Sequence, residues 1–270
     1  MIGKLYLVGT PIGNMKDITY RAIETLKSVD VIACEDTRHS MILLNYYDIK
    51  KPLVSYYMHK ERESGAKIIN MLLEGKNVAL ITDAGMPCVS DPGAILVKMA
   101  RENGVDCTVV PGASAVVSAM ALSGIDKKGF CFLGFLPSKN KDRLELLSPY
   151  KNIDIQLVFY SSPHDINDDL DFLFGVFGER NVYIIKEITK MFERVEIGTL
   201  GKIKVDEPKG EFVLIVEGEK VNSLKLDLSI LEHLKENMAS GLSKKDAIKL
   251  TAKERGLPKD VVYKESLKID

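Results

Sequence analysis

Short apolar segments that run into glycine- and proline-rich turns constrain the fold of this chain more than any other feature. Residues 5–8 are followed by such a turn at 9–14, residues 78–81 by one at 82–93, and residues 107–110 by one at 111–115. In an open α/β sheet, ligands bind beyond the carboxyl ends of the strands. Glycine lets backbone approach a ligand closely, and proline stiffens a loop. We therefore predict one pocket whose walls are the backbone and small side chains of these three turns.

The first half of the chain alternates predicted strands with predicted helices. The strands are expected at 4–8, 29–33, 52–57, 77–82, 106–110 and 130–134, and the helices at 17–28, 39–46, 60–74, 91–103 and 113–123. This alternation favours a mostly parallel sheet covered by helices on both faces. Residues 134–141 contain a glycine, a proline and then a basic polar run, which is typical of a linker. We predict an N-terminal α/β domain over residues 1–134.

The rest of the chain changes character twice. Residues 135–220 are predicted to form a second α/β domain with a mixed sheet, with strands at 155–160, 182–186, 192–197 and 212–217 and a helix at 164–177. A cofactor cleft between the two α/β domains is expected, because small-molecule sites are common at domain interfaces. Residues 221–270 are predicted to be a small helical tail, with helices at 228–238, 244–255 and 259–267. The tail has two readings, a helix-turn-helix and a cap that covers the sheet.

Composition narrows the class of protein. The chain has a formal net charge of −1, which argues against unselective coating of nucleic acid and leaves a local basic face open. Its four cysteines show no paired spacing, which favours reduced thiols over a zinc site or disulfides. No apolar run reaches the roughly 20 residues that a bilayer-spanning helix needs, and no signal peptide is recognisable. We expect a cytoplasmic protein with no membrane partner.

Common cofactor motifs are missing from the sequence. The first turn has the spacing G-x-x-x-G with Pro11 inside, whereas dinucleotide-binding turns have G-x-G-x-x-G. The first turn also lacks the Gly-Lys-Ser/Thr of a nucleoside triphosphate loop. The four histidines share no ligand spacing, so no metal site is predicted.

A polar segment, Glu35-Asp36-Thr37-Arg38, follows the second predicted strand and falls on the same sheet edge as the glycine turns. One reading is structural, with Asp36 or Thr37 capping the next helix and Arg38 pairing locally. The other is functional, with Arg38 binding a substrate phosphate and an acidic neighbour holding it in place. Tyr56, Tyr57 and His59 end the next strand, and a similar polar segment, 160–164, ends a strand of the second half.

Read together, these segments resemble one family, the small-subunit ribosomal RNA methyltransferases of the tetrapyrrole methylase superfamily. The motifs that carry the resemblance are Tyr6-Leu7-Val8-Gly9-Thr10-Pro11-Ile12-Gly13-Asn14, Glu35-Asp36-Thr37-Arg38, Asp83-Ala84-Gly85-Met86-Pro87, Ser90-Asp91-Pro92-Gly93 and Pro111-Gly112-Ala113-Ser114-Ala115. Later motifs agree, namely Gly134-Phe135-Leu136-Pro137, Lys186-Glu187-Ile188-Thr189-Lys190 and Lys209-Gly210-Glu211-Phe212-Val213. The resemblance covers about residues 1–218. The chain departs from the family pattern at Met15, at Cys88 and at Tyr57-Met58.

The resemblance implies a two-domain enzyme that uses S-adenosylmethionine to methylate the 2'-hydroxyl of a cytidine ribose in the decoding region of 16S rRNA. It also implies a homodimer that acts on the assembled small ribosomal subunit. By position in the motifs, it implies that the cofactor is bound by Pro11, Ile12, Asp83, Met86, Ser114, Ala115, Tyr160 and Phe212.

A ribose hydroxyl is a poor nucleophile, so methyl transfer to it calls for a base or a polarising group. The polar residues that follow the second and third predicted strands give Glu35, Asp36 and His59 as candidates, with Arg38 as a phosphate anchor. Lys186 and Glu187 are further candidates. The sequence does not choose among them. RNA phosphates are expected to meet scattered basic residues, including Lys139, Lys141, Arg143, Lys244, Lys245 and Lys249.

Two other functions remain open at this point. One is a methyltransferase of the same superfamily that acts on a tetrapyrrole or a protein side chain, and the Thr-Pro-Ile-Gly-Asn sequence of the first turn argues against it. The other is a non-catalytic RNA-binding or ribosome-assembly factor. The intact Asp83 and Pro-Gly-Ala-Ser turn argue against that factor.

Overall fold

The computed structural model describes residues 1–57, 61–126, 129–219 and 228–269. The chain divides into two compact units, one made of residues 1–151 and 155–217 and the other of residues 152–154 and 218–270. The first unit holds both β-sheets, and the second holds the C-terminal helices. His59, one of the predicted bases, lies outside the described residues.

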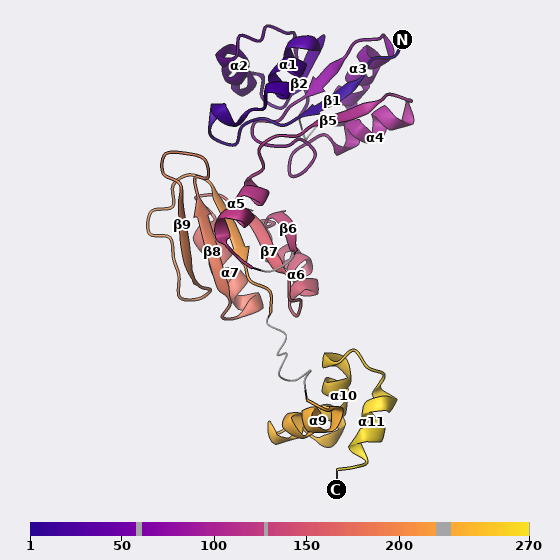
Figure 1. Cartoon of the computed structure of the whole chain (residues 1–270), viewed down its shortest axis with the longest axis vertical. Coiled ribbons are helices and arrows are strands. Elements are labelled where there is room, and N and C mark those ends of the chain that lie inside the picture. The colour runs from indigo at the N-terminus through magenta and orange to yellow at the C-terminus, as the bar shows by residue number, and fades with distance from the viewer. Residues whose placement is uncertain (58–60, 127–128, 220–227, 270) are drawn as a thin grey trace. The chain divides into compact units, whose positions relative to one another are not determined.

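The first sheet is parallel throughout and has the strand order β3-β2-β4-β1-β5. Figure 1 labels its strands β1, β2 and β5. Its strands are β1 (Leu5–Val8), β2 (Val31–Cys34), β3 (Leu53–Ser55), β4 (Val78–Leu80) and β5 (Cys107–Val110). The chain leaves β1 towards β2 on one side and leaves β4 towards β5 on the other. The neighbouring carboxyl ends of β1 and β4 therefore form a topological switch point, where open α/β sheets bind their ligands.

Helices cover both faces of this sheet, because successive side chains of a strand point to opposite faces. Leu5 and Leu80 pack with α3 (Glu61–Leu73) and α4 (Ala94–Glu102), and Val8 and Ile81 pack with α1 (Tyr20–Ser28) and α2 (Thr37–Tyr46). The mostly parallel, doubly covered sheet that the sequence predicts is confirmed.

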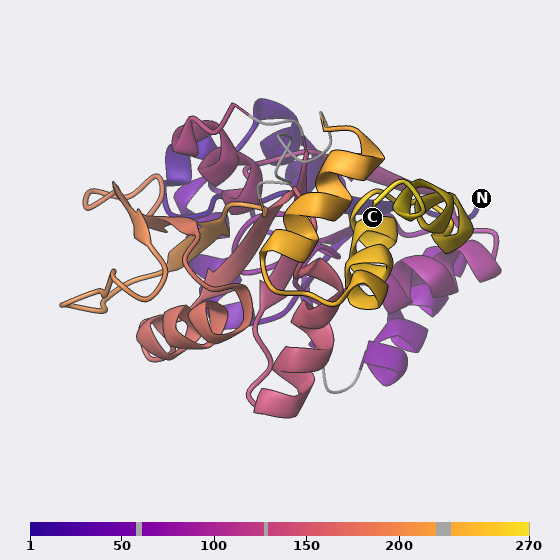
Figure 2. The same cartoon turned by 90° about the horizontal axis from the view of Figure 1, so that it is seen from below.

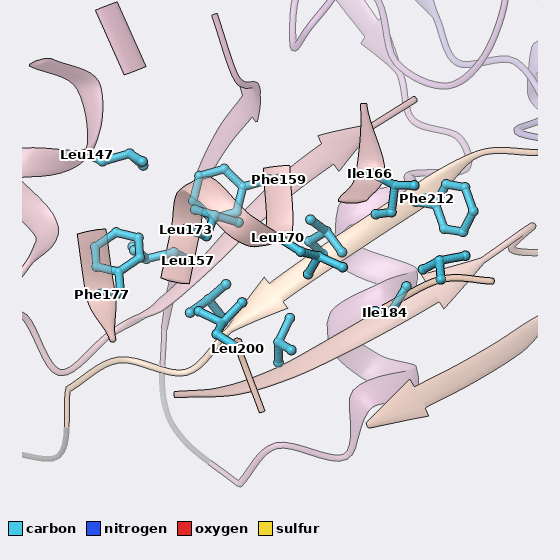
Figure 3. Close-up of a cluster of buried hydrophobic side chains, with 14 residues drawn as sticks. Leu147, Leu157, Phe159, Ile166, Leu170, Leu173, Phe177, Ile184, Leu200 and Phe212 are labelled. Atoms are coloured by element: carbon cyan, nitrogen blue, oxygen red, sulfur yellow. The ribbon is translucent and has the colours of Figure 1, made fainter. Parts of the chain in front are cut away.

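The second sheet is mixed, with the order β6-β7-β10-β8-β9. Its strands are β6 (Phe130–Phe135), β7 (Gln156–Ser161), β8 (Asn181–Lys186), β9 (Arg194–Thr199) and β10 (Phe212–Val216), and only β6 and β7 pair in parallel. Helix α7 (Ile166–Phe177) buries a core of leucine, isoleucine and phenylalanine against one face (Figure 3). Helix α5 (Ala115–Ser123) covers the other face.

Three predictions for the middle of the chain are wrong. Residues 130–135 join the second sheet, where we expected them with the first group of strands, because their neighbour in the ladder is β7. The predicted linker runs into a helix, α6 (Asn140–Leu147), which precedes a short 3-10 turn, Ser148–Tyr150. Arg143 on α6 is buried and pairs with the buried Asp169 (Nη2 to Oδ1, 3.2 Å). Contrary to the prediction, Arg143 is therefore not available to RNA phosphates.

The start of the first helix also differs from the prediction. A 3-10 turn, Met15–Asp17, comes first, and α1 begins at Tyr20 after Thr19. The Thr19 side chain accepts a hydrogen bond from the backbone N–H of Ala22, which caps the helix. Thr19, and not Asp17, is the N-cap of α1, because its side-chain oxygen lies where the unpaired N–H groups of the first turn point.

The C-terminal unit is a bundle of three short helices, α9 (Ile230–Ala239), α10 (Lys244–Glu254) and α11 (Lys259–Ser266), as predicted (Figure 2). The three helices share a small core of Leu234, Ala247, Ala252 and Val262. Whether the bundle works as a helix-turn-helix stays a prediction, as do the domain limits at 134 and 220. Among the helices that the structure describes, none has the length and apolarity to cross a membrane.

Candidate active site

The three glycine-rich turns come together at the carboxyl edge of the parallel sheet. Gly9 and Gly112 meet backbone to backbone, because a Cβ added to Gly9 would lie 2.7 Å from the Cα of Gly112. The backbone N–H of Thr10 donates to the carbonyl of Gly85 at 2.9 Å, and its hydroxyl donates to the carbonyl of Thr82 at 3.1 Å. The turn after β1 is thus joined to the turn after β5 and to the turn after β4.

A cavity of about 420 Å³ lies against these turns. The first turn contributes Ile12, the second contributes Asp83 and Met86, and the third contributes Ser114 and Ala115. The prediction that the three turns line one pocket is confirmed. Its opposite wall comes from the second sheet and its loops, including Tyr160, Ile185 and Phe212.

Seven of the eight residues predicted to bind a cofactor therefore line the same cavity. They are Ile12, Asp83, Met86, Ser114, Ala115, Tyr160 and Phe212. Pro11 lines a neighbouring cavity. Their contact with a cofactor stays a prediction. Phe212 is also part of the core beneath α7 (Figure 3), with 2% of its surface exposed, so little of it is available to a ligand.

The charge of the large cavity is one-sided. Asp83, Asp91 and Glu211 line it, whereas none of the described lining residues is lysine or arginine. Burial and the nearby Asp83 raise the pKa of Asp91. Glu35 lies near the same group, since burial and the charges of Asp83 and Asp91 raise its pKa. Such a wall disfavours a phosphate-bearing ligand and favours a ligand that carries positive charge.

One end of the cavity also meets the start of a helix. Ser114 caps α5, accepting a hydrogen bond from the N–H of Val117 at 3.5 Å, and Ser114 and Ala115 both face the cavity. The first turn of a helix presents unpaired N–H groups and the positive end of its dipole. The cavity thus has carboxylates that suit a cationic group and, at Ser114 and Ala115, the positive end of a helix dipole that suits an anionic one.

A second cavity, of about 230 Å³, adjoins the first. It is lined by residues of the first turn, by His39, Ser40, Ile42 and Leu43 of α2, and by Lys190. The two cavities share Ile12, Asp83, Ala84 and Glu211. Two ligands bound side by side would therefore meet at these four residues.

The residues predicted to be catalytic, Glu35, Asp36 and Arg38, lie outside the lining of both cavities. Asp36 caps α2 by accepting the backbone N–H of Arg38 at 2.8 Å, and the Arg38 guanidinium pairs with its carboxylate at 2.9 Å. The hydrogen bonds from the Arg38 side chain and backbone lower the pKa of Asp36 to about 2. Neither residue lines either cavity, and Glu35 does not either. The structure thus shows the capping arrangement, and a catalytic role for Glu35, Asp36 and Arg38 stays a prediction.

Of the candidates on the second sheet, Lys186 donates to the carbonyl of Glu207 at 3.1 Å and lies over the ring of Phe212. Sequence reasoning did not single out Glu211 and Lys190 as site residues, although both stand in motifs that it noted. The signal was too weak because their pairing joins two loops that are distant along the chain.

Known proteins resemble the chain over nearly its whole length. The family model described as Tetrapyrrole (Corrin/Porphyrin) Methylases matches residues 4–204. A Halalkalibacterium halodurans protein named ribosomal RNA small subunit methyltransferase I is 44% identical over 97% of this chain and 93% of its own length. Proteins of the same name from Bacillus subtilis and Escherichia coli O157:H7 are 41% and 40% identical, over 97% and 98% of this chain and 93% and 95% of their own lengths.

Solved structures agree with the fold. A diphthine synthase matches with a TM-score of 0.65 and 17% identity, over 80% of this chain and 90% of its own. A uroporphyrin-III-C-methyltransferase from Thermus thermophilus matches with a TM-score of 0.58 and 22% identity, over 79% of this chain and 94% of its own. The family model and the curated relatives show that the chain belongs to the tetrapyrrole methylase family, among the members named ribosomal RNA small subunit methyltransferase I.

Proposed function

We propose that this protein transfers a methyl group from S-adenosylmethionine to the 2'-hydroxyl of a cytidine ribose in the decoding region of 16S rRNA. Its place among relatives named for small-subunit rRNA methylation supports the reaction class and the substrate. The observation that carries the choice of cofactor is the large cavity, which joins an acidic wall to the start of a helix.

The residues of this cavity suit the proposed cofactor. S-adenosylmethionine supplies a reactive methyl group on a positively charged sulfur and also carries an ammonium and a carboxylate group. Asp83 and Asp91 would attract the positive groups, and the N–H groups at the start of α5 would attract the carboxylate. Ile12, Met86 and Ile185 provide apolar surface for an uncharged ring. The lack of a lysine or arginine among the described lining residues fits a cofactor without phosphate.

The smaller cavity is the proposed place of the acceptor nucleotide. It opens beside the larger one and carries the cationic side chain of Lys190. Holding two reactants in line is itself a large part of catalysis, with effective molarities of about 10⁵ M or more in well-oriented systems. We further propose that the enzyme is a homodimer and acts in the cytoplasm, on small ribosomal subunits. Sedimentation at micromolar concentration tests the dimer.

Isothermal titration with S-adenosylmethionine tests the cofactor site. We expect micromolar binding by the wild-type protein and a loss of at least about tenfold in Asp83→Ala, because an acidic wall residue is removed. Asp106→Ala is the matched control, since this exposed aspartate precedes β5 at the opposite, amino end of the sheet. Equal binding by Asp83→Ala and the wild type would contradict the assigned wall.

The acceptor is tested with labelled cofactor and isolated small subunits, followed by mapping of the label. Label on a decoding-region cytidine that survives alkaline hydrolysis, as a 2'-methylated ribose does, would support the proposal. Cofactor binding without any transfer to subunits would contradict the proposed rRNA substrate. A lack of cofactor binding would contradict the proposal that the protein is an enzyme that uses S-adenosylmethionine.

A further inference from the structure

The wall between the two cavities contains two carboxylates. Of the four residues that line both cavities, Ile12 and Ala84 are apolar, and Asp83 and Glu211 are acidic. If the proposed function holds, the methyl donor lies on one side of this wall and the ribose hydroxyl on the other. The groups at the wall are then those that meet the reacting atoms. Asp83 stands in the turn already assigned to the cofactor, which leaves Glu211.

Glu211 is held in place by three hydrogen bonds. Its backbone N–H donates to Oε1 of Glu187 at 2.9 Å, and its carbonyl accepts from the N–H of Glu187 at 2.9 Å. Its own Oε2 accepts from Nζ of Lys190 at 2.8 Å. Lys190 is held in turn, because Nζ also donates to Oε1 of Glu187 at 2.9 Å. The Glu211 carboxylate is thus oriented while 74% of its side chain stays exposed, where a substrate can reach it.

The backbone around these hydrogen bonds has several residues with positive φ angles, a feature that clusters at functional sites. Glu187 has φ +51° and Thr189 has φ +67°, a left-handed conformation that is costly for residues other than glycine. Gly210 has φ +85°, and a Cβ there would lie 2.4 Å from the carboxyl group of Glu187. A Cβ on Gly13, in the first turn, would lie 2.7 Å from Cγ of Lys190. Two glycines therefore make room for the side chains that hold Glu211.

Lys190 itself is a poor candidate for the base. Burial lowers its pKa, but the hydrogen bonds to Glu211 and Glu187 outweigh burial and raise the pKa overall. The side chain therefore stays an ammonium near neutral pH, which orients a carboxylate and does not take up a proton. Glu187 uses Oε1 for Lys190 and for the backbone of Glu211, so it serves to hold the other two.

We propose that Glu211 is the catalytic base of the methyl transfer and that Lys190 is the residue that positions it. In the step, the ribose oxygen forms a bond to the methyl carbon while the carbon–sulfur bond breaks and its electron pair stays on sulfur. The hydroxyl proton passes to the Glu211 carboxylate. The products are a methyl ether, a neutral thioether and a protonated carboxyl group, which returns its proton to water.

The test is Glu211→Gln, with Glu207→Gln as the matched control. Glu207 lies in the same loop with 78% of its side chain exposed, and it lines neither cavity. With cofactor and enzyme in excess over small subunits, we expect the single-turnover rate of Glu211→Gln to fall about 10²- to 10⁴-fold, as is usual when a general base is removed. The cofactor is kept at saturating concentration, so that weaker binding caused by the lost wall charge does not lower this rate. The melting temperature should match that of the wild type.

The dependence of the rate on pH separates a base from a structural residue. Between pH 6.5 and 9 the wild-type rate should be nearly flat, because proton removal by a base of the enzyme does not depend on the hydroxide concentration. The rate of Glu211→Gln should rise about tenfold per pH unit, since hydroxide then has to remove the proton. Glu211→Asp should keep the flat profile at an intermediate rate. Lys190→Met should also lose rate and keep a flat profile, because the base remains.

Several results would overturn the proposal. One is a Glu211→Gln rate within about threefold of the wild type, and another is a large loss with an unchanged flat profile. If Glu211→Gln does not fold, Glu211→Asp with a rising profile would also count against it. These failures differ from failure of the proposed function, in which the wild-type protein itself would not bind the cofactor or label the subunits.

Discussion

The contact between Gly9 and Gly112 gives the sharpest prediction about how the fold builds the cavity. A methyl group on Gly9 would lie 2.7 Å from Cα and N of Gly112 and 2.7 Å from the sulfur of Met86. The end of the methionine side chain can move aside. The backbone of the turn after β5 would have to move away until the contact reaches about 3.4 Å, where ordinary van der Waals contacts begin. Overpacking of this kind costs about 1–3 kcal/mol.

For a unit of about 200 residues, each kcal/mol shifts the melting temperature by about 2–4 °C, so Gly9→Ala should melt roughly 2–12 °C below the wild type. Because both turns and Met86 line the same wall, titration should also show at least about tenfold weaker binding of S-adenosylmethionine.

Gly175→Ala is the control. Gly175 lies inside α7 with no atom within 4 Å of an added Cβ, so alanine should stabilise the protein by about 0.5–1 kcal/mol. Differential scanning calorimetry measures both variants. If Gly9→Ala melted within about 1 °C of the wild type and bound the cofactor equally well, the reasoning that these turns are in tight contact would be refuted.

Three further predictions concern other parts of the chain. Asp169→Ala should lower the free energy of unfolding by about 3–5 kcal/mol in denaturant titrations, because it leaves Arg143 buried without its partner, and a loss below about 1 kcal/mol would contradict a buried pair. Ser229→Ala removes a capping box and should cost about 1 kcal/mol, seen as faster amide exchange in the first turn of α9, whereas unchanged exchange would count against the cap. In Arg38→Ala the pKa of Asp36 should rise from about 2 towards its usual range, as NMR titration of the carboxyl carbon would show. The lowered pKa favours the folded state above the unfolded pKa and loses this effect as the pH falls towards 2, and an unshifted pKa in the variant would mean that Arg38 is not its cause.

The glycine turns show how far local sequence reaches into the site. Strands such as Leu5–Val8 are short and apolar, and the turns behind them are rich in glycine and proline, so both are readable within a few residues. Parallel strands place their carboxyl ends on one edge, and this general geometry is enough to predict that Ile12, Asp83 and Ser114 share a cavity. The resemblance to a methylase family rested on the same turns, and the relatives at 40–44% identity confirm the family.

Other features were decided only by packing between distant segments. Nothing near residues 130–135 says which sheet they join, since the choice depends on their pairing with β7. Arg143 looks like a surface cation in the sequence, and its burial follows from Asp169 on another helix. For Asp36 and Arg38 the sequence left a cap and a substrate contact open, and the structure shows the cap.

The arrangement of Lys190 with Glu187 and Glu211 marks the boundary between the two kinds of information. Its local signs, a glycine before Glu211 and a polar motif around Lys190, are visible in the sequence. That these side chains meet at the wall between two cavities depends on the β8–β10 pairing and on the space left by Gly13 in the first turn. The amino-acid sequence alone was therefore enough to predict the strands, the turns and the family. Tertiary structure determined which charged groups face each other, because charge pairing depends on distance in space and not on separation along the chain.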